Sequence, residues 1–305
     1  MPDPTEMVLT GSVAAAFVIF AVVALAGWAR GKVCRSVVVG TCARTEEGER
    51  AAPAWEEPPP ARETGGVPVW FYRPVDLLGA CFVFGVFGVL GLSAAGHAGD
   101  ALPAMGPTTL LVNIGFQFVM AGVVAIGVVR RVGWVAWLGL RWPGWPWVFL
   151  IAPCAVLFMW AVFGSLLEFG YTEWMESLGA ETVQDTVKLL QQSEDPRVLG
   201  LMAFAAVVAA PLCEEMVFRG YFYPVLKKFA GTWVAAVCSA LVFATAHGNL
   251  SALLPLFVFG GVLVFVYEKT GSLWAPIAVH FCFNSATVVA QIAARYFHLP
   301  LDVAP

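Results

Sequence analysis

The chain has 305 residues, 59% of them hydrophobic and 12% charged, and it carries a formal net charge of −4. Soluble domains carry about 25% charged residues, so this composition excludes an ordinary soluble protein and predicts an integral membrane protein. The seven cysteines are scattered without paired spacing, which favours neither a disulfide framework nor a thiolate metal site. No basic cluster suggests nucleic acid as a partner.

Apolar runs long enough to cross a bilayer core of about 30 Å recur along the chain. They predict an all-α fold, a polytopic transmembrane helix bundle of about eight spans embedded in the lipid bilayer. The first run follows acidic rather than basic residues, so a retained helix is expected there instead of a secretory signal. The expected spans are 8–28, 77–95, 107–129, 145–167, 198–226, 232–247, 251–268 and 272–294.

These spans divide the chain into four expected regions. An N-terminal transmembrane helix (1–29) precedes a cytoplasmic linker rich in Pro and Glu (30–76), which is expected to have no core of its own. The transmembrane bundle (77–295) and a short C-terminal tail (296–305) follow. Tryptophans cluster around the start of the fourth span and predict an interfacial anchor rather than a binding site: Trp134, Trp137, Trp142, Trp145 and Trp147.

Basic residues predict the orientation of the bundle. Of the seventeen Lys and Arg residues, fourteen lie in four segments, 30–73, 130–141, 219–228 and position 269. With eight spans, all four segments fall on one side of the membrane, and the positive-inside rule makes that side cytoplasmic. We therefore expect a multi-pass protein of the cell membrane with both termini on the opposite side.

The fifth span is unusual because it combines a long uncharged stretch with three ionisable residues, Glu214, Glu215 and Arg219. Ionisable groups at such depth are costly and by default mark function. Glu215 and Arg219 are four residues apart and share a helix face, so they are expected to form a supporting ion pair. Glu214 points about 100° away from Glu215 and is left as the free carboxylate.

Polar residues of two later spans reach similar depths. At about 1.5 Å of rise per residue, Glu214 lies about 20 Å and His247 about 22 Å from the side that carries the basic residues. His280 and Asn284 lie about 12 Å and about 18 Å deep and share one face of the last span. The overlap predicts one buried polar site built from three helices.

A carboxylate with two histidines supports two chemistries. In the first, Glu214 and His247 activate a water molecule while His280 and Asn284 donate hydrogen bonds to the developing oxyanion. In the second, Glu214, His247 and His280 hold a zinc ion that lowers the pKa of its bound water. Both chemistries hydrolyse a carbonyl compound, and the residues alone leave both open.

Three motifs, in this order on successive apolar segments, carry a resemblance: Glu214-Glu215-x-x-x-Arg219, Phe243-x-x-x-His247 and His280-x-x-x-Asn284. They resemble the CPBP (Abi) family of intramembrane proteases, which includes the type II CAAX prenyl proteases and bacterial bacteriocin-processing or immunity proteins. The resemblance covers about residues 196–292, and Leu138-Gly139-Leu140-Arg141 is similar to the family more loosely.

The resemblance implies an all-helical intramembrane endopeptidase whose site opens toward the cytoplasm. It assigns water activation to Glu214 and His247 and oxyanion stabilisation to His280 and Asn284. The implied substrate is a membrane-associated peptide or protein, with a lipidated C-terminal peptide as the eukaryotic case. The alternative function is that of a non-catalytic membrane immunity or scaffold protein of the same family, which would bind a partner through the same pocket.

Overall fold

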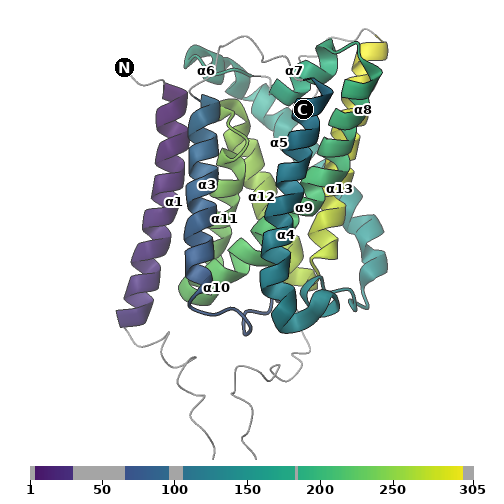
Figure 1. Cartoon of the computed structure of the whole chain (residues 1–305). Helices are drawn as coiled ribbons and strands as arrows, with labels where there is room; N and C mark the ends of the chain where they lie inside the picture. The colour runs from purple at the N-terminus through teal and green to yellow at the C-terminus, as the bar shows by residue number, and fades with distance from the viewer. Residues whose placement is uncertain (1–3, 30–65, 96–105, 183–184, 298–305) are drawn as a thin grey trace, which may run out of the picture.

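The computed structural model describes residues 4–29, 66–95, 106–182 and 185–297. In this part of the chain all regular structure is helical, and Figure 1 shows the helices packed side by side in one bundle. The all-α prediction is therefore confirmed. The beginning of α1 (Pro4–Ala29) and the end of α13 (Trp274–Tyr296) lie at the same end of the bundle in Figure 1.

Six helical stretches of the described chain are long and apolar enough to cross a membrane: Glu6–Ala29, Pro107–Trp137, Trp145–Glu168, Pro196–Ala230, Leu250–Thr270 and Trp274–Tyr296. The other two predicted spans correspond to shorter apolar helices, Asp76–Val89 within α3 (Asp76–Ala95) and α11 (Thr232–Thr245). Six of the eight expected spans are thus candidates in the described part of the chain, and the other two are shorter there. The 14 residues of α11 give about 21 Å of helix, less than a bilayer core of about 30 Å.

The predicted fifth span is not a uniform α-helix. It contains α8 (Pro196–Phe204), α9 (Ala210–Val217) and α10 (Tyr223–Ala230), and two π-helical segments, Ala205–Ala209 and Phe218–Phe222, separate them. A proline occupies the second residue of each helix that follows a π segment. Single-turn π segments occur frequently at functional sites. The acidic motif lies on α9, between the two π segments.

The basic end of the bundle is closed by the chain just before α3. Residues 66–75 form this closing segment, in which Val67, Phe71 and Tyr72 are buried. Lys227 donates to the Val67 carbonyl at 3.2 Å, and Lys228 donates to the Tyr72 carbonyl. The last part of the predicted linker therefore packs against the bundle, whereas 30–65 lies outside the described residues.

α4 (Pro107–Trp137) ends beside the closing segment. Arg131 of α4 donates to the Asp76 carboxylate at 2.6 Å, and Trp137 is 2% exposed. Trp137 is therefore a core residue rather than an interfacial anchor, because its indole N–H has a buried partner described below. Trp145 and Trp147, which lie in a 3₁₀ turn before α5 (Val148–Glu168), are exposed as an anchor would be.

A tight contact joins the turn after α4 to the start of α13. Leu273 donates its backbone N–H to the Leu138 carbonyl at 3.1 Å. Gly139 has a φ of +64°, and a Cβ at this position would lie 2.6 Å from the Cα of Ser272. Only glycine fits such a contact in the left-handed region of φ. The turn thus fixes the start of the helix that carries His280.

The opposite end of the bundle carries two short helices, α6 (Tyr171–Ser177) and α7 (Asp185–Gln192). α7 includes Val187 and Leu190, and Leu190 is buried. The Gln191 amide donates to Gln291 of α13 at 2.8 Å. α7 therefore packs onto the end of α13.

Candidate active site

The predicted pairing of Glu215 with Arg219 is confirmed. The Nη1 of Arg219 lies 2.8 Å from Oε1 of Glu215, and both side chains are fully buried. His280 joins them from α13, with its Nδ1 2.9 Å from the same Glu215 oxygen and an exposed fraction of 2%. We call these three residues the inner cluster. The helical repeat predicted the ion pair between Glu215 and Arg219 but not the hydrogen bond between Glu215 and His280.

The guanidinium of Arg219 is held from three sides. Besides Glu215, it donates through Nη2 to the Gly260 carbonyl of α12 (Leu250–Thr270) at 3.1 Å. Its Cζ lies 4.4 Å from the centre of the Phe243 ring of α11, within cation–π range. A buried cation needs such compensation, since an unpaired charge at this depth would cost several kcal/mol. The inner cluster thus ties α9, α11, α12 and α13 together.

His247 follows α11 directly and is only partly buried. Its Nδ1 lies 2.9 Å from the Phe243 carbonyl, which can only accept, so Nδ1 carries a proton. In the neutral imidazole this leaves Nε2 as an acceptor. The Phe243 ring contacts both imidazoles, with centroids 5.0 Å from His247 and 5.9 Å from His280.

Glu214 differs from its neighbour Glu215 in burial and in partners. Its side chain is partly buried and makes no hydrogen bond to a described residue, and its Oε2 is buried without a partner. The Oε2 of Glu215 is also unpartnered, but the Oε1 of Glu215 bonds both Arg219 and His280. Electrostatic interactions link Glu214 to His280 and Arg219. A buried, unpartnered carboxylate oxygen is unusual in a folded protein and calls for an explanation such as a bound water or a catalytic role.

Asn284 reaches back to the first π segment. In a π-helix each carbonyl accepts from the N–H five residues later, and Ala210 donates to the Ala205 carbonyl in this way. The next carbonyl, that of Ala206, would by the same pattern accept from the N–H of residue 211, which is a proline. Proline has no N–H, and the Asn284 amide donates to Ala206 instead, at 2.7 Å. Its second amide hydrogen remains for other partners.

Of the six predicted residues, the structure joins Glu215, Arg219 and His280 in the inner cluster. Glu214 and His247 each interact electrostatically with Arg219, and Asn284 lies one turn after His280 on α13. We call these three partly buried residues the outer cluster, although no direct contact among them is recorded in the described part of the chain. Among the described residues, no three His, Cys, Asp or Glu side chains are grouped so that they could hold a metal ion. The predicted zinc ligands Glu214, His247 and His280 do not fit a metal in this arrangement.

Two further residues near the site, Tyr72 and Trp137, are not indicated by the sequence motifs. Both donate to the Gly220 carbonyl in the second π segment, Trp137 through Nε1 at 2.8 Å. The available signal was Pro224, because a proline leaves the carbonyl four residues earlier without its helical donor. Which side chains replace that donor depends on tertiary packing and was not predictable.

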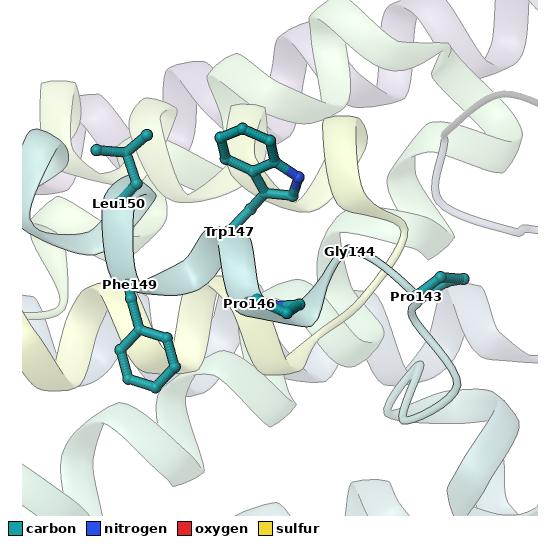
Figure 2. A pocket seen from close by; sticks show the side chains of 6 residues that line it. All are labelled: Pro143, Gly144, Pro146, Trp147, Phe149 and Leu150. Atoms are coloured by element: carbon teal, nitrogen blue, oxygen red, sulfur yellow. The ribbon is translucent and has the colours of Figure 1, made fainter.

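None of the polar residues of the inner and outer clusters lines either of two hollows on the described surface. The first, of about 480 Å³, lies at the start of α5, where Figure 2 shows Trp147 and Leu150 directed away from Phe149. The second, of about 360 Å³, is apolar and lies between α4, α9 and α13. Leu212 and Met216 line it and point about 200° around α9 from Glu214.

Comparison with known proteins supports the resemblance carried by the motifs. Residues 196–286 match the model of the Rce1-like type II CAAX prenyl endopeptidase family. The chain is 24% identical over 136 residues to the putative membrane peptidase YdiL of Bacillus subtilis, covering 45% of this chain and 52% of that protein. It is 28% identical over 102 residues to the membrane-embedded CAAX protease MroQ of Staphylococcus aureus, covering 32% and 41%.

A third relative is the uncharacterized protein YpbD of Bacillus subtilis, 28% identical over 146 residues that cover 47% of this chain and 69% of that protein. The alignments to YdiL and MroQ span about half the length of those relatives. No solved structure matches the chain. The matched segment contains all six residues of the inner and outer clusters. Over this segment, the chain is similar to the Rce1-like type II CAAX prenyl endopeptidase (CPBP) family of membrane proteases.

Proposed function

We propose that this protein is an intramembrane endopeptidase that hydrolyses a peptide bond with a water molecule activated by Glu214 and His247. One observation carries the proposal: the Glu214 carboxylate, whose Oε2 is buried, makes no hydrogen bond to a described residue, whereas the neighbouring Glu215 carboxylate is bonded to Arg219 and His280. A structural carboxylate would be expected to have partners like those of Glu215. An unpartnered one suits a group that must bind water and take up a proton.

The outer cluster supplies the two groups that general-base catalysis needs. A water molecule between Glu214 and the Nε2 of His247 would donate hydrogen bonds to both. As its oxygen attacks the substrate carbonyl, its proton moves to the carboxylate. The proton then passes to the departing nitrogen as the C–N bond breaks, which leaves a carboxylic acid and an amine.

Oxyanion stabilisation is assigned to His280 and Asn284. His280 keeps its Nδ1–H on Glu215, and as an imidazolium it would present Nε2–H to the oxyanion. Asn284 would present the amide hydrogen that is not bonded to Ala206. Packing holds both side chains before the substrate arrives, which is the condition under which such donors lower the barrier most.

The substrate proposed is a membrane-associated peptide or protein, and the site is proposed to open toward the cytoplasm. The basic residues Arg131, Lys227, Lys228 and Lys269 support this orientation, because they gather at the end of the bundle that the closing segment covers. MroQ carries the name of a CAAX protease, so a CAAX-type peptide is the first substrate to test.

The test is cleavage of a CAAX-type peptide, and of a panel of membrane-anchored peptides, by purified protein in lipid nanodiscs. Glu214→Gln should lower kcat on the order of 10²- to 10⁴-fold, because it removes the base but keeps the shape of the side chain. Glu168→Gln, at an exposed glutamate at the end of α5, is the matched control and should leave kcat unchanged. Full activity of Glu214→Gln, or biological function retained without any cleavage, would favour the immunity or scaffold alternative.

A further inference from the structure

The carbonyl of Gly220 lies one residue after Arg219, inside the second π segment. Pro224 follows four residues later and has no N–H, so this carbonyl lacks the donor that a regular helix would provide. An unpaired carbonyl buried in a membrane protein costs several kcal/mol. The hydroxyl of Tyr72 and the indole N–H of Trp137 supply the missing hydrogen bonds.

Both donors are buried and rigidly placed. Tyr72 is 1% and Trp137 2% exposed. A Cβ on Gly220 would lie 2.9 Å from the Trp137 ring and 3.1 Å from Leu273, so only glycine allows the backbone to approach the indole this closely. The segment that follows Arg219 is therefore held by side chains from outside its own helix.

Tyr72 is itself anchored on both sides of its peptide. Lys228 donates to the Tyr72 carbonyl, and Arg131 donates to the preceding Phe71 carbonyl at 3.4 Å. Burial raises the pKa of the Tyr72 phenol well above its usual value, so the hydroxyl remains protonated and can donate at any working pH. The closing segment thus presents a permanent donor to the π segment.

From this geometry we propose that Tyr72 and Trp137 are positioning residues for the reaction. By holding the Gly220 carbonyl they fix the backbone of the second π segment, and through it the place of Arg219. Arg219 in turn places Glu215, which orients His280. The proposal rests on the proposed function for its catalytic consequence, but the placement of His280 can be measured without any activity.

The kinetic experiment compares two tyrosines at the same end of the bundle. Tyr72→Phe removes only the hydroxyl bonded to Gly220, whereas Tyr221→Phe removes a hydroxyl that donates to Asp76 at 3.2 Å. Tyr72→Phe should lower kcat on the order of tenfold with KM unchanged, since a shift well under 1 Å at a reacting group costs less than a hundredfold. Tyr221→Phe should leave kcat unchanged. If both variants lose kcat only in proportion to the loss of folded protein, the role is merely structural and the proposal fails.

A second variant tests whether the carbonyl is the link. Trp137→Phe removes the other side-chain donor to the Gly220 carbonyl. In that background Tyr72→Phe should cost more activity than in the native protein, because the carbonyl is then left without either side-chain donor. Additive effects of the two substitutions would show that Tyr72 acts through something other than this carbonyl, and would overturn the proposal.

The readout that needs no substrate is nitrogen-15 NMR of the imidazoles, which is tractable because the chain has four histidines. A His280→Gln sample assigns the His280 signals. Tyr72→Phe should shift the His280 signals and leave those of His247 in place, and Tyr221→Phe should shift neither. A shift in a protein that cleaves nothing would uphold the positioning role while the proposed function fails. An unchanged His280 signal would overturn the positioning role even in an active enzyme.

Discussion

The inner and outer clusters use the same residue types for opposite purposes. Glu215 and His280 are buried and bonded to each other, and Glu215 is also paired with Arg219. Glu214 and His247 are partly buried, and each keeps an atom free for a further partner. Two adjacent glutamates thus differ in role because successive residues of a helix face different surroundings. The comparison teaches that the paired charges hold the inner cluster together, whereas the proposed chemistry depends on a carboxylate that has no hydrogen-bond partner of its own.

The largest effect is expected from breaking the inner cluster. Arg219→Met leaves the Glu215 carboxylate buried without its cation, which should lower the free energy of unfolding by about 3–5 kcal/mol and abolish cleavage. Adding Glu215→Gln should recover part of the stability, because no charge is then left alone. Unfolding in detergent measures both, with exposed Arg197→Met as the control. A double variant no more stable than Arg219→Met would contradict the buried-pair explanation.

A change in the outer cluster should separate activity from stability. His247→Asn keeps an amide donor near the position of Nδ1, which bonds the Phe243 carbonyl, but it removes Nε2. We expect kcat to fall on the order of 10²- to 10⁴-fold while the melting temperature changes little. Peptide cleavage and thermal unfolding of the same samples provide the test. A large drop in melting temperature would place His247 with the structural residues instead.

Asn284 combines features of the two clusters, because its side chain is only partly buried and yet it donates a hydrogen bond to a backbone carbonyl. Asn284→Leu leaves the Ala206 carbonyl without its donor and should cost about 1–3 kcal/mol of unfolding free energy. Ser285→Ala, which removes an exposed hydroxyl from the next residue, should cost almost nothing. Equal stabilities of the two variants would show that the Ala206 bond carries little weight.

The smallest expected effect is that of a chelator. If Glu214 and His247 activate water directly, treatment with a metal chelator should leave the cleavage rate unchanged. A zinc metalloprotease assayed in parallel confirms that the chelator works. Loss of activity that added zinc restores would show that the catalytic state differs from the arrangement described here.

Much of the fold follows from the sequence because helix length and apolarity are local properties. The predicted spans 107–129 and 251–268 lie within α4 and α12, and the pairing of Glu215 with Arg219 follows from helical repeat alone. Span number was less predictable. Whether α11 crosses the membrane depends on how the neighbouring helices cover its ends. The sequence of α11 alone does not contain that information.

The arrangement of the site could be predicted only in part. The depth estimate assumed a straight helix from Glu214 to Lys227, but a π segment interrupts this stretch and changes its phase. For this reason the bond between Glu215 and His280 could not be derived from spacing. The packing of the closing segment could not be predicted either, because residues 66–75 read as the end of a Pro-rich linker. Only the tertiary structure shows that Lys227 and Lys228 donate to backbone carbonyls of this segment.

The contact at Gly139 sets a limit on how this sequence can vary. A single methyl group there would have to displace the backbone of Ser272, which begins the turn into α13 eight residues before His280. Since α13 is a continuous helix, a displacement at its start would also move the imidazole of His280. The lipid-facing residues of α4 can exchange one apolar side chain for another, but position 139 accepts only a hydrogen atom. A laboratory library of random substitutions should therefore recover glycine at this turn as reliably as it recovers the glutamates.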